Sequence, residues 1–98
     1  MKRLRLDAAA RAELLHEVKY YEATRRGTGR KFREAVEAVF VRIVRTSDAG
    51  KPDEDGCRRL RVKGYPFAVV FREDSRELVV YAIRGEARNP GYWRERAK

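Results

Sequence analysis

The segment Phe67-Ala68-Val69-Val70-Phe71 restricts the fold more than any other part of the chain, because it is apolar at every position. A strand with one face in water alternates apolar and polar residues, whereas an unbroken apolar run is typical of a strand buried on both faces or covered by helices. We therefore expect residues 67–72 to form the central strand of a sheet. A chain of 98 residues has room for one compact domain, which we expect to span residues 1–98.

Three other segments are predicted to be strands. Residues 3–6 read Arg-Leu-Arg-Leu, the alternation of a short, half-buried strand. Residues 57–63 and 77–84 are the strand candidates on either side of the central run. Residues 73–76 read Glu-Asp-Ser-Arg, which predicts a polar hairpin connection between the last two strands.

Two segments after the first strand follow the helical period. Asp7 is the expected N-cap of a helix over residues 8–26, and Gly27 is its expected stop. Thr28 is the expected cap of a second helix with a stronger apolar stripe. Because the Gly27-Thr28-Gly29 break is so short, the two helices should form an antiparallel hairpin. The stripes comprise Ala8, Leu14, Leu15, Val18 and Tyr21 in the first helix and Phe32, Val36, Val39, Phe40, Ile43 and Val44 in the second.

The order of the elements predicts the fold class. Residues 47–56 are rich in turn formers and lack periodicity, so they should form a surface loop. Asn89-Pro90 is an N-cap followed by a proline, which predicts a short C-terminal helix over residues 91–96. Because strands and helices do not alternate, we expect an α+β fold in which the N-terminal strand and helical hairpin accompany an antiparallel sheet of three to four strands, with the hairpin on one face. The predicted core includes Val36, Phe40, Ile43, Phe67, Val69 and Phe71.

Composition excludes several classes of protein. No run approaches the roughly 20 apolar residues of a membrane span, and the N-terminus lacks the apolar part of a signal peptide, so a cytoplasmic protein is expected. Cys57 and His16 are the only residues of their types, so neither an internal disulfide nor a zinc site is expected, and no cofactor is expected either. The formal net charge of +9 favours an acidic partner, which charge alone does not identify as RNA, DNA or protein. A basic surface kept for solubility is the alternative interpretation.

The first candidate binding residues lie in the strand predicted at residues 57–63. Strand alternation should place Arg58 inward with Leu60 and Val62, leaving Arg59 and Arg61 outward on one face. Two neighbouring guanidinium groups suit the bidentate binding of phosphate or carboxylate. The alternative is a charged edge strand that prevents aggregation.

The second candidate group follows the last predicted strand, where loops commonly present functional side chains. Arg84 and Arg88 are its candidate binding residues, together with Tyr92 and Trp93. For the two aromatic residues we favour packing back on the sheet, because an exposed tryptophan is unfavourable. His16 lies in the first helix, far in sequence from both arginine groups, and we do not expect it to be catalytic.

Three motifs along the chain carry a family resemblance. Residues 14–22, Leu-Leu-His-Glu-Val-Lys-Tyr-Tyr-Glu, with the following Gly-x-Gly break and Phe32, resemble the first helical hairpin of the RelE/ParE toxin superfamily, with its A-x-x-E-L and Y-Y-E pattern. Arg58-Arg59, followed by Tyr65-Pro66-Phe67, resembles the family's R-R and F-P-Y stretch. Residues 88–96, Arg-Asn-Pro-Gly-Tyr-Trp-Arg-Glu-Arg, resemble its R-x-P-x-Y-W-x-x-R ending. The similarity covers nearly the whole chain except residues 47–55.

The resemblance implies the toxin of a type II toxin–antitoxin pair, closest to the ParE-like branch. Such a toxin binds a target such as DNA gyrase without a catalytic residue, and an acidic antitoxin segment wraps it. A second hypothesis is a ribosome-dependent mRNA interferase, a metal-independent endoribonuclease in which Arg59, Arg61, Arg84 and Arg88 hold phosphate and Tyr92 assists proton transfer. A toxin-derived domain without toxicity, or an unrelated basic binding module, is a third.

Two departures from the family pattern bear on the choice. Members of the ParE-like branch often have a histidine after the last strand, where this chain reads Ala82-Ile83-Arg84-Gly85. RNA-cutting members usually have an arginine in the central strand where this chain has Ala68, and the lysine-rich set is incomplete. These departures favour binding over cleavage.

Overall fold

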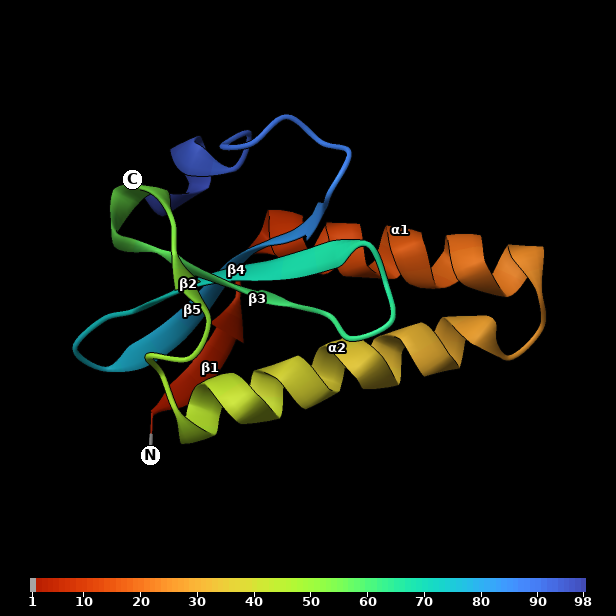
Figure 1. Cartoon of the computed structure of the whole chain (residues 1–98), viewed down its shortest axis with the longest axis horizontal. Helices are drawn as coiled ribbons and strands as arrows, with labels where there is room; N and C mark the ends of the chain where they lie inside the picture. The colour runs from red at the N-terminus through yellow and green to blue at the C-terminus, as the bar shows by residue number, and fades with distance from the viewer. Residues whose placement is uncertain (1) are drawn as a thin grey trace.

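The computed structural model describes residues 2–98, and its layers are organised around one five-stranded mixed sheet (Figure 1). The strand order across the sheet is β1-β5-β4-β3-β2, so the all-apolar run lies in the middle strand, as predicted. The helical hairpin lies along one face. The elements are β1 (Arg3–Leu6), α1 (Ala8–Thr24), α2 (Thr28–Arg45), β2 (Lys51–Pro52), η1 (Glu54–Gly56), β3 (Arg58–Arg61), β4 (Phe67–Glu73), β5 (Glu77–Gly85) and η2 (Arg94–Ala97).

The predicted antiparallel sheet is formed by β2, β3, β4 and β5, and β1 adds a fifth strand that pairs with β5 in parallel. The register joins Arg3 to Glu77 and Leu6 to Val80, and the Asp7 N–H donates to the Val80 carbonyl at 2.8 Å. Four alternating residues predict a strand but do not encode the direction of its neighbour. The direction follows from connectivity, since the two helices carry the chain away from β1 and back before the remaining strands pair antiparallel.

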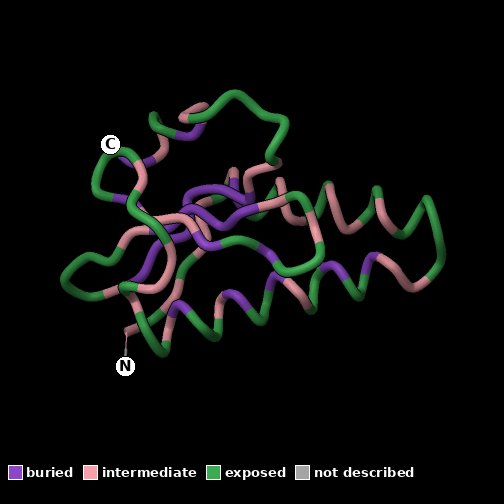
Figure 2. Tube along the Cα trace, viewed as in Figure 1, coloured by how far each residue is buried: buried purple, intermediate pink, exposed green. Residues whose placement is uncertain are grey.

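Both faces of the sheet are covered, which explains the unbroken apolar run of β4. Val69 and Phe71 face the helices and pack in one core with Phe32 of α2. Val70 faces the opposite side and packs in a second core with Trp93 of the C-terminal segment. The buried trace in Figure 2 accordingly runs through β4 and β5 and along one side of α2. Of the predicted core residues, Val36, Ile43, Val69 and Phe71 are buried, and Phe40 and Phe67 are partly buried at its margin.

The buried face of α1 differs from the prediction. Ala10 is the buried residue of this helix, whereas Leu15 leaves 53% of its surface exposed. Leu14, Val18 and Tyr21 do pack against the core, each partly buried. The apolar residues of α1 spread around the helix, so spacing alone identified three residues of the buried face but also included Ala8 and Leu15, which are exposed. The helix also ends at Thr24, two residues before the predicted boundary.

The turn between the helices depends on two glycines and one carboxylate. Gly27, rather than Thr28, is the N-cap of α2 and has a φ of 87°, a conformation that favours glycine. The Glu22 carboxylate accepts hydrogen bonds from the Gly27 N–H at 3.0 Å and the Gly29 N–H at 3.1 Å. A Cβ at Gly29 would lie 2.6 Å from the Val18 carbonyl oxygen, so only glycine allows this close approach.

Two predicted segments form different structure from that expected. Residues 47–56 contain the two-residue strand β2 and the short η1 turn as well as irregular loop. The C-terminal segment forms turns and then the short 3₁₀ helix η2, which begins at Arg94, three residues later than the short helix predicted over residues 91–96. A helix this short has little intrinsic stability, and the segment instead follows the packing of Trp93, which is fully buried. No helix of the described chain is long and apolar enough to cross a bilayer.

Candidate functional site

A row of three residues crosses the sheet on the face opposite the helices. Ala68 of β4 is the register partner of Arg61 in β3 and of Arg84 in β5. Leu60 and Val69, the chain neighbours of Arg61 and Ala68, belong to the core beneath the helices. Because successive side chains of a strand point to opposite faces, the row lies on the side of the sheet away from the helices, which we call the far face. The row borders an open pocket of about 500 Å³, lined by Arg42, Gly50, Lys51, Arg59, Leu60, Arg61, Ala68, Arg84 and Glu86.

The alternation predicted for the β3 arginines is present. Arg59 and Arg61 lie on the far face, whereas Arg58 lies on the face of Leu60 and donates from Nε to the Ala49 carbonyl at 3.1 Å. A second bond of Arg58, from Nη2 to the Gly50 carbonyl at 2.9 Å, completes its attachment to the loop. Arg58 therefore holds the loop against the sheet edge, and only two of the three β3 arginines face the pocket.

The far-face arginines have weak or missing partners. Arg61 Nη1 lies 3.5 Å from Glu86 Oε1 with both side chains largely exposed, and Arg59 Nη1 lies 3.6 Å from Asp53 Oδ2. The exposed Arg61–Glu86 pair contributes at most about 1 kcal/mol, so an anionic ligand competes with it readily. Arg59 is held more firmly, because its Nη1 also donates to the Pro52 carbonyl at 3.2 Å and the Asp53 side chain is mostly buried. Within residues 2–98, the buried Nε of Arg84 has no hydrogen-bond partner. The row can therefore accept carboxylate or phosphate groups.

A second polar group, centred on Glu13 of α1, joins the helix to the C-terminal segment. The Glu13 carboxylate accepts hydrogen bonds from the Tyr92 hydroxyl at 2.6 Å, Arg96 Nη1 at 2.9 Å and the Ile83 N–H at 3.0 Å. The Glu13 and Arg96 side chains are only 15% and 21% exposed. The Arg88 guanidinium lies 3.9 Å from the centroid of the Tyr92 ring. We refer to Glu13, Tyr92, Arg96 and Ile83 as the Glu13 network.

The Glu13 network controls the chemistry of the Tyr92 hydroxyl. Burial raises the pKa of Tyr92 well above its ordinary value, and the hydrogen bond to Glu13 raises it further. The phenol therefore stays protonated and serves as a hydrogen-bond donor to a carboxylate. This state does not suit a general base.

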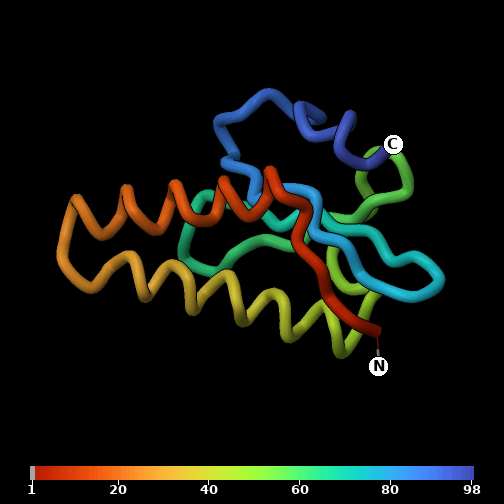
Figure 3. The backbone as a smooth tube through the Cα atoms, turned by 180° about the vertical axis from the view of Figure 1, so that it is seen from behind, coloured from red at the N-terminus to blue at the C-terminus, as the bar shows by residue number. Residues whose placement is uncertain are grey.

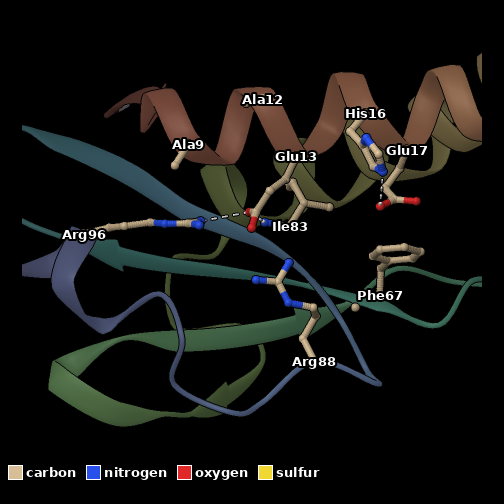
Figure 4. A pocket seen from close by; sticks show the side chains of 10 residues that line it. Ala9, Ala12, Glu13, His16, Glu17, Phe67, Ile83, Arg88 and Arg96 are labelled. Carbon is tan, nitrogen blue, oxygen red and sulfur yellow. Dashed lines mark hydrogen bonds and ion pairs between the residues drawn. The ribbon is translucent and has the colours of Figure 1, made fainter.

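An open groove of about 800 Å³ lies between α1 and the C-terminal segment (Figure 4). Its α1 wall carries Glu13, His16 and Glu17, and Arg88 and Arg96 reach in from the opposite side. His16 is far in sequence from both arginine groups, but in the fold it lines the same groove as Arg88. Its imidazole is 76% exposed and its Nε2 lies 4.0 Å from Glu17 Oε2.

The structure divides the sequence-predicted residues into three groups. Arg59, Arg61 and Arg84 line the far-face pocket. Arg88 and Tyr92 stack on one another beside the Glu13 network. Trp93, with no exposed surface, packs in the core and is not available for contact in this conformation.

Sequence reasoning missed Glu13 and Arg96. Glu13 follows Ala10 as Ala-x-x-Glu-Leu, the phrase of the family pattern, and it lies one residue before the partly buried Leu14. An acidic residue beside a core position was the available signal. Arg96 falls at the last arginine of the C-terminal motif.

Comparison with known proteins identifies the family. The model of the ParE toxin of the type II toxin–antitoxin system parDE matches residues 4–90. The chain belongs to the ParE toxin family. A solved structure described as the chromosomal ParDE toxin–antitoxin system from P. aeruginosa is similar to this toxin, with a TM-score of 0.68 and 25% sequence identity. The similarity covers 87% of this chain and 96% of that one. No curated protein sequence matches the toxin.

Proposed function

We propose that this toxin stops growth by binding DNA gyrase, not by cutting RNA, and that a cognate acidic antitoxin neutralises it. The observation that carries the proposal is the state of Tyr92, whose hydroxyl donates to Glu13 at 2.6 Å and has a raised pKa. RNA cleavage without a metal needs a group that takes a proton from the 2′-hydroxyl, and this phenol has no tendency to do so.

The far-face row of Arg61, Ala68 and Arg84 also favours binding over RNA cleavage. A nuclease must also neutralise the charge that develops on phosphate, and loss of one preorganised cation costs on the order of a hundredfold in rate. Ala68 supplies no cation at the centre of the row between Arg61 and Arg84. The arginines on either side remain suitable for binding an acidic partner.

The antitoxin is the partner that these arginines fit best. We propose that Arg59, Arg61 and Arg84 of the pocket, with Arg88 at the neighbouring groove, bind carboxylates of the antitoxin. The similar P. aeruginosa structure is described as a ParDE toxin–antitoxin system, which supports this pairing. Its ion pairs would replace the long surface contacts of Arg59 and Arg61.

An mRNA interferase is the second candidate, supported by the unpartnered Nε of Arg84 beside Arg61. The two candidates differ in what Tyr92→Phe does. This variant removes the hydroxyl but keeps the ring, so a binding toxin should remain toxic, whereas a nuclease that uses the phenol should lose most activity.

The test is inducible expression of the wild type and Tyr92→Phe in bacteria, with DNA synthesis and translation followed separately. We expect DNA synthesis to fall first in both strains. Tyr20→Phe is the matched control, because Tyr20 is 60% exposed on α1 and lies outside the Glu13 network. Early arrest of translation that Tyr92→Phe abolishes and Tyr20→Phe does not would contradict the proposal.

A further inference from the structure

The far end of the helical hairpin is a concentrated basic surface. Between residues 19 and 33 the chain has six cationic side chains and one carboxylate, Glu22. All six cationic residues are exposed. We call this surface the hairpin tip; its cations are Lys19, Arg25, Arg26, Arg30, Lys31 and Arg33.

These cations are not neutralised by the protein itself. No ion pair among residues 2–98 includes any of the six. Glu22, the carboxylate within this stretch, is bound to the backbone N–H groups of Gly27 and Gly29 and also lies near Arg26 and Arg30. Glu34 directly follows the stretch, so the hairpin tip presents an excess of positive charge to solvent rather than six isolated cations.

The hairpin tip protrudes and is rigidly held. It lies at one end of the molecule's longest axis, beyond the sheet and far from both chain ends (Figures 1 and 3). Behind it, Tyr21 of α1 and Phe32 of α2 pack on each other with ring centroids 4.9 Å apart. The ring of Tyr65, from the β3–β4 connection, packs edge-on against both, with its centroid 5.4 Å from that of Tyr21 and 5.0 Å from that of Phe32. This aromatic cluster fixes the direction in which the cations point.

The composition of the hairpin tip favours phosphates over a protein surface. Stable protein interfaces have an apolar, desolvated centre. The hairpin tip offers only one large exposed aromatic residue, Tyr20, which is too little apolar surface for such a centre. Four of the six cations are arginines, whose planar forks bind phosphate oxygens in pairs. A convex, charged and rigid end can lie against a nucleic-acid backbone without reading its sequence.

We propose that the hairpin tip binds the phosphate backbone of double-stranded DNA, so that the toxin meets gyrase on the DNA that the enzyme holds. The choice of duplex DNA rests on the proposed function, whereas the location of the site rests on the charges alone. Contact with phosphates releases counterions, so binding weakens steeply as salt is added and shows no sequence preference.

The test is binding of the purified toxin to a labelled DNA duplex of arbitrary sequence, measured by fluorescence anisotropy across a salt series. The tip variant is Arg25→Gln, Arg26→Gln and Arg30→Gln. The matched control is Arg3→Gln, Arg45→Gln and Arg76→Gln, which removes the same charge from exposed residues of β1, the end of α2 and the β4–β5 turn. β1, the C-terminal end of α2 and the β4–β5 turn lie at the end of the molecule opposite the α1–α2 turn (Figure 1).

We expect the tip variant to bind the duplex at least about tenfold more weakly at low salt. The plot of the logarithm of the association constant against the logarithm of the salt concentration should become less steep by about 2.7, which corresponds to three lost phosphate contacts. The control should lose much less of both. Equal losses in the two variants would overturn the inference, because net charge alone would then explain binding. Single-stranded RNA or a polyglutamate peptide that binds more tightly than duplex DNA, and whose binding is weakened by the tip variant but not by the control, would overturn it as well.

A gyrase assay separates this inference from the proposed function. If the wild type binds duplex DNA through the tip but does not inhibit gyrase, the proposed target is wrong and the DNA site stands. If the wild type inhibits gyrase without binding DNA, the proposed target stands and the DNA site is wrong.

Discussion

At the scale of single residues, Glu13 connects parts of the chain that are distant in sequence. Its carboxylate joins α1 to the backbone of β5 and to two side chains of the C-terminal segment. Sequence patterning located the partners Tyr92 and Arg96 within a motif but did not reveal why they occur together. The reason is a tertiary contact across 79 and 83 residues, and no local period encodes such a contact.

Replacement of Glu13 by alanine should therefore destabilise the fold. The change leaves the hydroxyl of Tyr92 and the Ile83 N–H without their acceptor in a mostly buried site. It also removes the ion-pair partner of Arg96, which keeps its hydrogen bond to the Tyr81 carbonyl at 3.0 Å. We expect a loss of about 2–4 kcal/mol in the free energy of unfolding, measured by urea denaturation. Glu17→Ala is the control and should change stability by less than about 0.5 kcal/mol, because the one ion pair of Glu17 within residues 2–98 is the 4.0 Å contact with exposed His16. Equal effects of the two changes would show that the network contributes little.

At the scale of elements, sequence periodicity predicted the features that depend on residues near one another in the chain. It did not predict the features that depend on distant residues. The apolar stripe of α2 and the burial of both faces of β4 were predicted correctly, because each follows from a pattern within one short segment of the sequence. The parallel pairing of β1 was not predicted, and Leu15 was wrongly placed on the buried face of α1, because both depend on partners elsewhere in the chain. The predicted C-terminal helix is a 3₁₀ helix that begins only at Arg94, since the burial of Trp93 outweighs a weak local helix signal.

The helical hairpin should lose stability in acid through Glu22. Hydrogen bonds from the Gly27 and Gly29 N–H groups hold the pKa of this carboxyl below its ordinary value of about 4.5. Because the folded pKa is lowered, the stabilisation is complete above pH 4.5 and is lost as the pH falls through the lower, folded pKa. Comparison of wild type with Glu22→Gln by thermal unfolding should show a difference at neutral pH that shrinks in strong acid. A difference that stays constant down to that range would exclude the carboxylate as the cause.

At the scale of the whole molecule, positive charge is divided among surfaces with different geometry. The far-face pocket is concave and backed by the sheet, whereas the hairpin tip is convex and lies at the end of the 40 Å long axis. A concave site can enclose side chains of a wrapped antitoxin, and a convex one can lie against a larger body. The net charge of +9 predicted an acidic partner without showing that the cations form separate sites.

Antitoxin binding should accordingly depend on salt through the far face. Arg59→Ala with Arg61→Ala should slow association with the antitoxin and reduce its salt dependence, because exposed charges act mainly on encounter. Stopped-flow or surface-binding kinetics at several salt concentrations measure both quantities. Arg3→Ala with Arg76→Ala removes equal charge from exposed residues outside the pocket and should have a smaller effect. An unchanged salt response in the far-face variant would place the antitoxin elsewhere.

The most direct test of the account compares two purified targets with one toxin preparation. The toxin is added to DNA gyrase with relaxed plasmid, and separately to ribosomes that carry mRNA. We predict that supercoiling is inhibited, that the mRNA stays intact, and that the antitoxin restores supercoiling. Unaffected supercoiling together with cleavage of the ribosome-bound mRNA would contradict the central claim.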